Sequence, residues 1–331
     1  MLASEIIRRV KEIQVRTGRQ VADVLAGEYI SVFKGGGIEF DEVRPYIPGD
    51  DIRSIDWNVT ARVGEPYVKR FVEERQLTLM LMADVSPSQE FGSGSRSKRD
   101  ATAEFCALLA FSANQNDDKV GLVLFHGGVE QYIPPRKGQK HALRVVREVL
   151  AHGQNAPESK SPSQASSNAR SLSIWDKTVN RFKLNKEKTL RSADQTTDIG
   201  QAMQFFLSVT KRKAVCFLVS DFLDDNYEQA LMTANRKHDV VAVLITDPRE
   251  LKMPGVGLIA LQDAETGTTQ LYDTSSRAFR DSLQKAGEKR IADLERNLRK
   301  RGIDFIHIDA SGSVVDPLVK FFRMREKRSR R

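Results

Sequence analysis

Two carboxylates and a set of hydroxyls at the ends of apolar segments have the clearest capacity for chemistry in this chain. Asp84, Ser86 and Ser88 lie in the sequence ADVSPS, directly after an apolar run. Asp221 ends a second apolar run, CFLVSD, and the threonine pair at 196–197 precedes a helical segment. Carboxylate and hydroxyl oxygens are hard donors, which suit Mg²⁺ or Mn²⁺. The pattern therefore predicts a site for a divalent cation.

The neutral hydroxyls decide what such a site would do. If Ser86, Ser88 and Thr197 bind the ion directly while the two aspartates act mainly through water, the cation keeps excess positive charge and attracts an external anionic oxygen. That is the chemistry of a binding site. A simpler alternative is turn formation, because serines after strands commonly shape turns and cap helices.

The apolar segments that carry these residues alternate with helical segments. Buried strands are expected at 77–84, 120–125, 214–221 and 240–247, and helices at 98–114, 140–150, 199–211 and 227–237. This alternation predicts crossover units and an α/β fold with a doubly wound, mostly parallel sheet. In such a sheet the carboxyl ends of the strands line one crevice, so Asp84 and Asp221 are expected to meet there.

The remaining segments complete the predicted sheet. Residues 127–135 alternate with period two and predict an antiparallel edge strand, and weaker strands are expected near 257–262 and 269–272. The segment 276–301 predicts a long helix, IDFIHID a last strand, and 314–324 a terminal helix.

Composition divides the chain into unequal parts. Residues 1–75 are expected to form a small module, with a helix at 3–13 and an irregular, partly stranded stretch between Tyr29 and Tyr67, packed on the main α/β domain at 76–325. Seven serines within 159–173 predict that residues 152–195 form a flexible insertion, and 326–331 form a basic tail.

Charge and cysteine content exclude several functional classes. The net charge of the 331 residues is +8, but the segment 323–331 contributes six basic groups and one acidic group, which leaves the body too weakly basic for a nucleic-acid groove. This tail is expected to be a solvated, frayed end; the alternative is peripheral contact with acidic lipid, nucleic acid or an acidic partner. Cys106 and Cys216 are expected to be buried thiols in a reducing compartment. Without an apolar leader or membrane span, the expected location is the cytoplasm.

The separated motifs resemble a known family. ADVSPS, TTDIGQAM and LVSD resemble the three elements of the metal-ion-dependent adhesion site of von Willebrand factor A-like domains. More specifically, GGGIEFDEVRPYIPGDDIRSIDWNVTAR, PYVKRFVEERQ, VGLVLF, YIPPRKG, VSDFLDD and HDVVAVLITDPRE resemble the bacterial family called domain of unknown function 58, from about Gly35 to Thr274 without the insertion.

The resemblance implies a von Willebrand factor A-like, Rossmannoid fold and an Mg²⁺ or Mn²⁺ ion. It implies the ligands Asp84, Ser86, Ser88, Thr197 and Asp221, with Thr196 a weaker match than Thr197. Gln89 departs from the family pattern, which usually has Met at this position. The resemblance also implies a MoxR-type AAA+ ATPase partner in the assembly or maturation of other proteins. The expected function is non-enzymatic, metal-dependent capture of a client's Asp or Glu carboxylate.

A second acidic cluster has a structural interpretation. Glu39, Asp41, Asp50, Asp51 and Asp56 are candidate acids or a second metal site. Asp50 and Asp51 follow Pro-Gly, however, where Asp commonly caps a turn, and nearby arginines offer ion-pair partners. Ion-pair and capping roles are therefore favoured over an active site.

Two rival functions remain on the sequence alone. One is a metal-dependent phosphoester hydrolase, which would need a general base that the sequence does not supply. Ser86 as a nucleophile would likewise need an adjacent base, and no histidine is expected at that crevice. The other rival is a nucleic-acid-associated protein that binds through its basic segments.

Overall fold

The computed structural model describes residues 37–74, 76–94, 96–152, 197–262 and 268–329, together with Ile13. The predicted helix at 3–13, apart from Ile13, and the predicted insertion at 152–195, apart from His152, lie outside the described residues.

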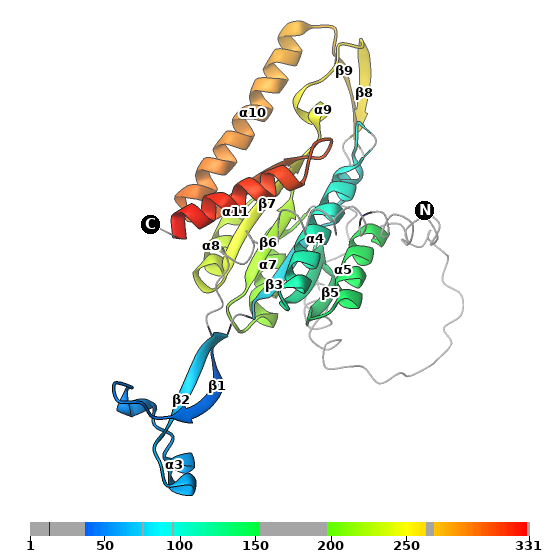
Figure 1. The fold of residues 1–331 in the computed structure, drawn as a ribbon. Helices are drawn as coiled ribbons and strands as arrows, with labels where there is room; N and C mark the ends of the chain where they lie inside the picture. Colours follow the sequence, from blue (N-terminus) through cyan, green and yellow to red (C-terminus); the bar gives the residue numbers. More distant parts are fainter. Residues whose placement is uncertain are drawn as a thin grey trace, which may run out of the picture.

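A six-stranded sheet forms the centre of the molecule (Figure 1). Its strand order is β10-β7-β6-β3-β4-β5. All neighbours are parallel except β5, which is the predicted antiparallel edge strand. The strands are β3 (Thr78–Asp84), β4 (Lys119–Phe125), β5 (Val129–Arg136), β6 (Val215–Ser220), β7 (Asp239–Thr246) and β10 (Asp304–Asp309). The doubly wound α/β fold class predicted from the sequence is confirmed.

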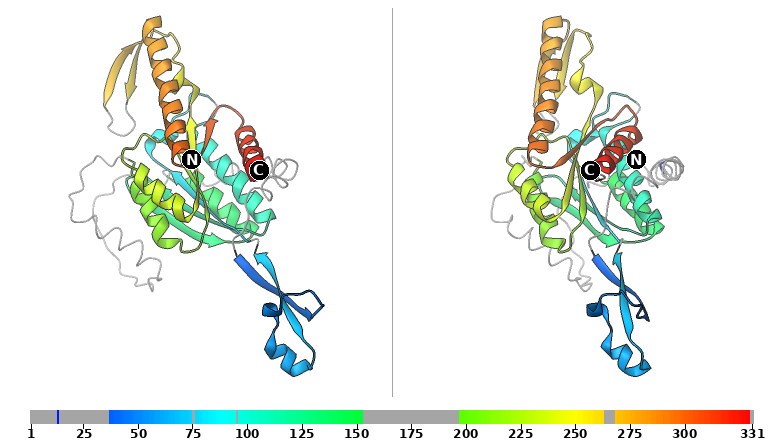
Figure 2. Two further views of the ribbon diagram at one scale, coloured as in Figure 1. Left: turned by 90° about the vertical axis from the view of Figure 1, so that its left-hand side faces the viewer. Right: turned by 60° about the vertical axis from the view of Figure 1, so that its left-hand side comes forward.

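Helices cover both faces of this sheet, which explains why the parallel strands are apolar throughout (Figure 2). Alternate residues of each strand serve the two faces, so Leu81 packs in one core and Met82 in the other. The first core includes residues of α4 (Lys98–Gln115), α5 (Gln139–Ala151) and α11 (Val315–Ser329). The second includes residues of α7 (Ile199–Val209), α8 (Glu228–Lys237) and α10 (Arg277–Lys300). Cys106 and Cys216 are buried free thiols, as predicted.

The N-terminal module is a hairpin arm that extends away from the sheet (Figures 1 and 2). Strands β1 (Gly37–Pro45) and β2 (Tyr67–Glu74) pair antiparallel, and η2 (Ile52–Ser54) and α3 (Trp57–Val63) lie between them. Residues 37–74 of the predicted module thus extend away from the main domain instead of packing on it, whereas Ile13, from the predicted N-terminal helix, packs against the first core. The short apolar segments of the module form the paired strands β1 and β2. Side chains such as Trp57, which is 66% exposed, remain uncovered.

Three aspartates of the arm, Asp50, Asp51 and Asp56, have the structural roles that the sequence favoured. Asp50 accepts both terminal N–H groups of Arg44, at 2.7 and 2.8 Å. Asp51 caps η2, and Asp56 caps α3 and pairs with Lys69 at 3.3 Å. These side chains are therefore engaged in capping and ion pairing.

A second projection lies at the opposite end of the molecule (Figure 1). It contains β8 (Leu258–Gln262) and β9 (Thr269–Asp273), which pair antiparallel, with α9 (Pro248–Leu251) and the start of α10 nearby. In the parts of the chain that the structure describes, no helix is both long and apolar enough to cross a bilayer.

The C-terminal segment differs from the expected frayed tail, because α11 continues to Ser329. Arg325 is only 14% exposed at its side chain and bonds two carboxylates, Asp239 at 2.6 Å and Asp304 at 2.6 Å. Asp239 is the first residue of β7, and Asp304 is the first residue of the neighbouring strand β10. An ion-pair network that composition alone could not reveal therefore connects α11 to the sheet.

Replacing Arg325 by Ala is expected to destabilise the protein by about 2 kcal/mol, because two partly buried carboxylates lose their common partner. Arg328→Ala is the matched control, since the Arg328 side chain is 57% exposed and shares only Asp304. This control should lose less than about 0.5 kcal/mol. Urea denaturation of both variants measures the difference, and equal losses would contradict the assigned role of Arg325.

Candidate metal-binding site

The candidate site lies where β7, β6 and β3, which are adjacent in the sheet, reach their carboxyl ends. Asp84 is the last residue of β3, Ser220 is the last residue of β6, and Asp247 follows β7. Parallel strands deliver these residues to one edge, so loops that are far apart in the sequence become neighbours.

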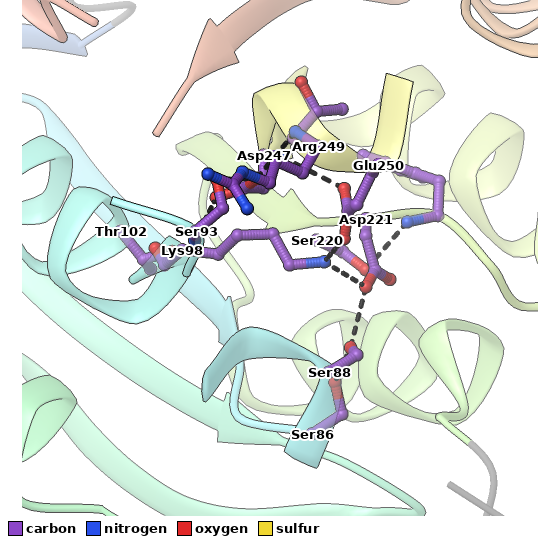
Figure 3. Close-up of polar contacts among 12 residues, drawn as sticks. Ser86, Ser88, Ser93, Lys98, Thr102, Ser220, Asp221, Asp247, Arg249 and Glu250 are labelled. Carbon is purple, nitrogen blue, oxygen red and sulfur yellow. Dashed lines mark hydrogen bonds and ion pairs between the residues drawn. The ribbon is translucent and has the colours of Figure 1, made fainter. Parts of the chain in front are cut away.

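The loop after β3 folds its polar groups toward the loop after β6 (Figure 3). The Ser86 N–H donates to Asp84 Oδ1 at 2.9 Å, and the hydroxyls of Ser86 and Ser88 lie 2.9 Å apart. Ser88 then donates to Asp221 Oδ2 at 2.7 Å, across 133 positions of sequence. Four of the five predicted ligands thus form one connected cluster. Ser86 stands at the N-cap of η3 (Pro87–Glu90) without a side-chain capping bond, so helix capping does not account for its hydroxyl.

The fifth predicted ligand, Thr197, lies at the same edge of the sheet. It is buried, at 5% exposure, just before α7. The N–H of Asp198 donates to the carbonyl of His126 after β4, and the N–H of Ile199 donates to Asp224 in the loop after β6. The participation of Thr197 as a metal ligand stays a prediction. His126 also corrects the expectation that no histidine lies at this edge.

Three residues that were not predicted from the sequence, Lys98, Ser220 and Glu250, also contact the cluster (Figure 3). Lys98, the first residue of α4, places Nζ 3.2 Å from Asp221 Oδ2 and 2.7 Å from Glu250 Oε1. Ser220 donates to Asp84 Oδ2 at 2.7 Å. Helical spacing could have predicted that Lys98 is buried, because position 98 lies on the same face of the helix as the apolar positions 101, 105 and 108.

The turn after β6 is tight, and Ser220 helps to hold it. Phe222 has a positive φ of 52°, which is uncommon for a residue with a bulky side chain. The Ser220 hydroxyl accepts the N–H of Phe222 at 3.1 Å while it donates to Asp84. One hydroxyl therefore links the conformation of the turn that carries Asp221 to the position of Asp84.

The cluster places two carboxylates together in a buried setting. Burial raises the pKa of Asp84 to about 6, and the negative charge of Asp221 contributes in the same direction. Hydrogen bonds from Ser220 and Ser86 oppose the rise, but burial dominates. An added positive charge at this point would relieve the cost of keeping Asp84 ionised.

The donor set fits a hard divalent cation. Two carboxylates and neighbouring hydroxyls supply oxygen only, which is the preference of Mg²⁺ and Mn²⁺. Among the described residues, no group of three or more His, Cys, Asp and Glu side chains is arranged for a metal, so hydroxyls would have to supply part of the shell. Residues that would hold the ion are Asp84, Ser86, Ser88, Asp221 and, as predicted, Thr197.

Gln89 is the residue at which the sequence departs from the family pattern. Its side chain is buried, at 1% exposure, beside the serine loop, and neither amide atom has a hydrogen-bond partner within the described residues. Its packing leaves the contacts of Ser86 and Ser88 intact.

Comparison with solved structures gives weak matches. BatB from Bacteroides thetaiotaomicron is 15% identical, with a TM-score of 0.41, and the match covers 76% of this chain and 99% of BatB. Proximal thread matrix protein 1 from the mussel byssus, in a structure with a zinc-occupied MIDAS motif, is 11% identical with a TM-score of 0.30, covering 51% of this chain and 38% of that protein. The fold assignment therefore depends on the strand order of this molecule itself.

Two mycobacterial proteins and one family model match this chain in sequence. The uncharacterized protein Rv1480 of Mycobacterium tuberculosis is 26% identical over 319 residues, which cover 96% of this chain and 89% of the relative. The uncharacterized protein MAV169 of Mycobacterium avium is 29% identical over 131 residues, covering 39% of this chain and 77% of the relative. The family model described as protein of unknown function DUF58 matches residues 42–293, most of the chain. The chain belongs to this DUF58 family.

Proposed function

We propose that the protein is a non-enzymatic, divalent-metal-dependent binding protein that captures a carboxylate of a partner. Its partners would be client proteins and a MoxR-type AAA+ ATPase, with which it would act in the assembly or maturation of other proteins. The ATPase partner comes from the family resemblance alone, whereas the capture mechanism is argued from the side chains of the site.

The observation that carries the proposal is the continuous contact from Asp84 through Ser86 and Ser88 to Asp221. It gathers hard oxygen donors from two loops at one edge of the sheet. Asp84 is held by the Ser86 N–H and the Ser220 hydroxyl, which orients it to act on an ion through water. The serine hydroxyls add ligands without charge, so a bound Mg²⁺ would keep the positive charge needed to attract an external carboxylate.

The test is capture by the immobilised protein from a bacterial lysate, in Mg²⁺ and in EDTA. The wild type should retain a set of proteins, including an AAA+ ATPase, in Mg²⁺ only. The Asp84→Ala/Ser86→Ala double variant should retain none of that set, because it lacks a carboxylate and a hydroxyl of the cluster. Circular dichroism checks that the variant is folded.

Two controls sharpen this experiment. Sodium acetate at high concentration should release the captured proteins if their carboxylates complete the metal's coordination shell, whereas the same concentration of sodium chloride should release fewer. Capture that persists unchanged in EDTA would contradict the proposed mechanism. Turnover of a generic phosphoester by the wild type that vanishes in Asp84→Ala would instead favour the hydrolase.

A further inference from the structure

Lys98 is a buried cation inside the candidate metal site. Its side chain is 1% exposed, and its ammonium contacts Asp221, which is 4% exposed, and Glu250, which is 29% exposed (Figure 3). A buried ammonium without partners is strongly unfavourable, so these two carboxylates hold its charge in place. The Lys98 ammonium contacts Oδ2 of Asp221, and the same oxygen accepts the hydrogen bond from the Ser88 hydroxyl.

We infer that Lys98 competes with the divalent cation for Asp221, so that this lysine sets the metal affinity of the site. The inference rests on the proposed function, since it concerns the same site. A cation coordinated among Ser86, Ser88 and Asp221 would lie close to the Lys98 ammonium, and like charges repel strongly in a buried, water-poor environment. Metal binding therefore requires Lys98 to give up Asp221.

Glu250 provides the position to which Lys98 can withdraw. The Lys98–Glu250 distance of 2.7 Å is already shorter than the 3.2 Å to Asp221. Glu250 is fixed by a capping box, in which its other oxygen accepts the N–H of Asp247 at 3.1 Å. Lys98 can thus leave Asp221 and still keep one carboxylate partner, Glu250.

The same contacts connect the site to the loop after β7. Asp247 accepts the N–H of Ser93, at 2.8 Å, from the loop that joins η3 to α4. Lys98 follows that loop, at the first position of α4. Lys98, Glu250 and Asp247 therefore link the loops after β3, β6 and β7 into one polar network. Among the described contacts, Lys98 is the only cation that reaches the carboxylate of a predicted ligand, because the Arg290 guanidinium donates to the backbone carbonyl of Asp221, at 3.1 Å.

The inference predicts opposite effects of two single substitutions on Mn²⁺ affinity, measured by calorimetry and by electron paramagnetic resonance of free Mn²⁺. Lys98→Met removes the competing charge and should lower the dissociation constant about tenfold or more. Glu250→Gln leaves Asp221 as the remaining carboxylate partner of Lys98 and should raise the dissociation constant several-fold. Lys98→Gln, which keeps a polar end group, serves as a second variant if Lys98→Met does not fold.

Lys137→Met is the charge-matched control. Lys137 pairs with Asp117 at the opposite edge of the sheet, beyond the end of the antiparallel strand β5, and should leave the Mn²⁺ affinity within about twofold of the wild type. A folded Lys98→Met or Lys98→Gln protein that binds Mn²⁺ no more tightly than the wild type overturns the inference but leaves the proposed function standing. Absence of Mn²⁺ binding in the wild type and in all folded variants overturns both. Binding by the lysine variants alone would support the role of Lys98 but would contradict metal binding by the wild type, and with it the proposed function.

A measurement on the wild type needs no substitution. Burial should protect the Lys98 ammonium from rapid solvent exchange, so its ¹⁵Nζ signal can be followed by nuclear magnetic resonance. Saturating Mg²⁺ should shift this signal and leave those of exposed lysines such as Lys137 unchanged. An unshifted Lys98 signal in Mg²⁺-saturated protein overturns the inference.

Discussion

Replacing Asp84 by Asn is expected to make the metal-free protein more stable near neutral pH. Burial, with help from Asp221, raises the pKa of Asp84 to about 6, so an ionised Asp84 is unfavourable in the folded state. Asn has nearly the same shape and no charge. With chelator present at about pH 7, the free energy of unfolding should rise by about 3 kcal/mol in the variant, because the pKa of Asp84 rises from 3.8 to about 6 and each pKa unit corresponds to roughly 1.4 kcal/mol.

The sign of this effect fixes its pH dependence. Between the unfolded pKa of 3.8 and the folded pKa of about 6, the folded protein holds a proton on Asp84 that the unfolded chain releases. This carboxyl therefore makes the wild type lose stability as the pH rises through that interval, and the loss is complete above the folded pKa. The advantage of Asp84→Asn should vanish below about pH 4.

Histidines with lowered pKa values act in the opposite direction, so the difference between wild type and variant is the informative quantity. Burial lowers the pKa of His238 to about 4, and it also lowers the pKa values of His141, His152 and His307. Urea denaturation in EDTA across this pH range gives the difference directly. Asp117→Asn is the control, because Asp117 is 78% exposed at its side chain and should change stability by less than about 0.5 kcal/mol. A variant that is less stable than the wild type above the folded pKa would contradict the assigned environment of Asp84.

The fold was predictable because its strands are buried on both faces. Runs such as Leu79–Ala83 are apolar without interruption, and the helices between them carry apolar residues at helical spacing. The N-terminal arm was less predictable. Its β-prone segments are short, and nothing in their pattern distinguishes a hairpin that packs on the domain from one that extends away from it.

The site was partly predictable, because position at a strand end is visible in the sequence. Asp84 and Asp221 end predicted strands, and parallel pairing brings them together. Lys98 was not identified because charged residues at a helix start are common and usually exposed. Glu250 was not identified because it also forms an ordinary capping box with Asp247. Their contact joins α4 to α9 across 152 positions of sequence, which is set by tertiary packing alone.

The proposed coordination shell contains hydroxyls as well as carboxylates, and a double substitution of serine separates coordination by hydroxyls from simple charge attraction. Ser86→Ala/Ser88→Ala removes two neutral donors and leaves Asp84, Asp221 and Lys98 in place, so the net charge of the site is unchanged. Loss of two ligands should weaken Mn²⁺ binding about 100-fold or more. Ser208→Ala/Ser282→Ala is the matched control, because these two serines bond helix carbonyls of α7 and α10.

Calorimetric titration of the chelator-treated protein with Mn²⁺ is therefore the most direct measurement. The wild type and the Ser208→Ala/Ser282→Ala control should bind a single Mn²⁺ per chain with equal affinity, and folded Ser86→Ala/Ser88→Ala should show no saturable binding in the same concentration range. Equal Mn²⁺ affinity in all three proteins, or no binding by the wild type, would contradict the existence of this metal site.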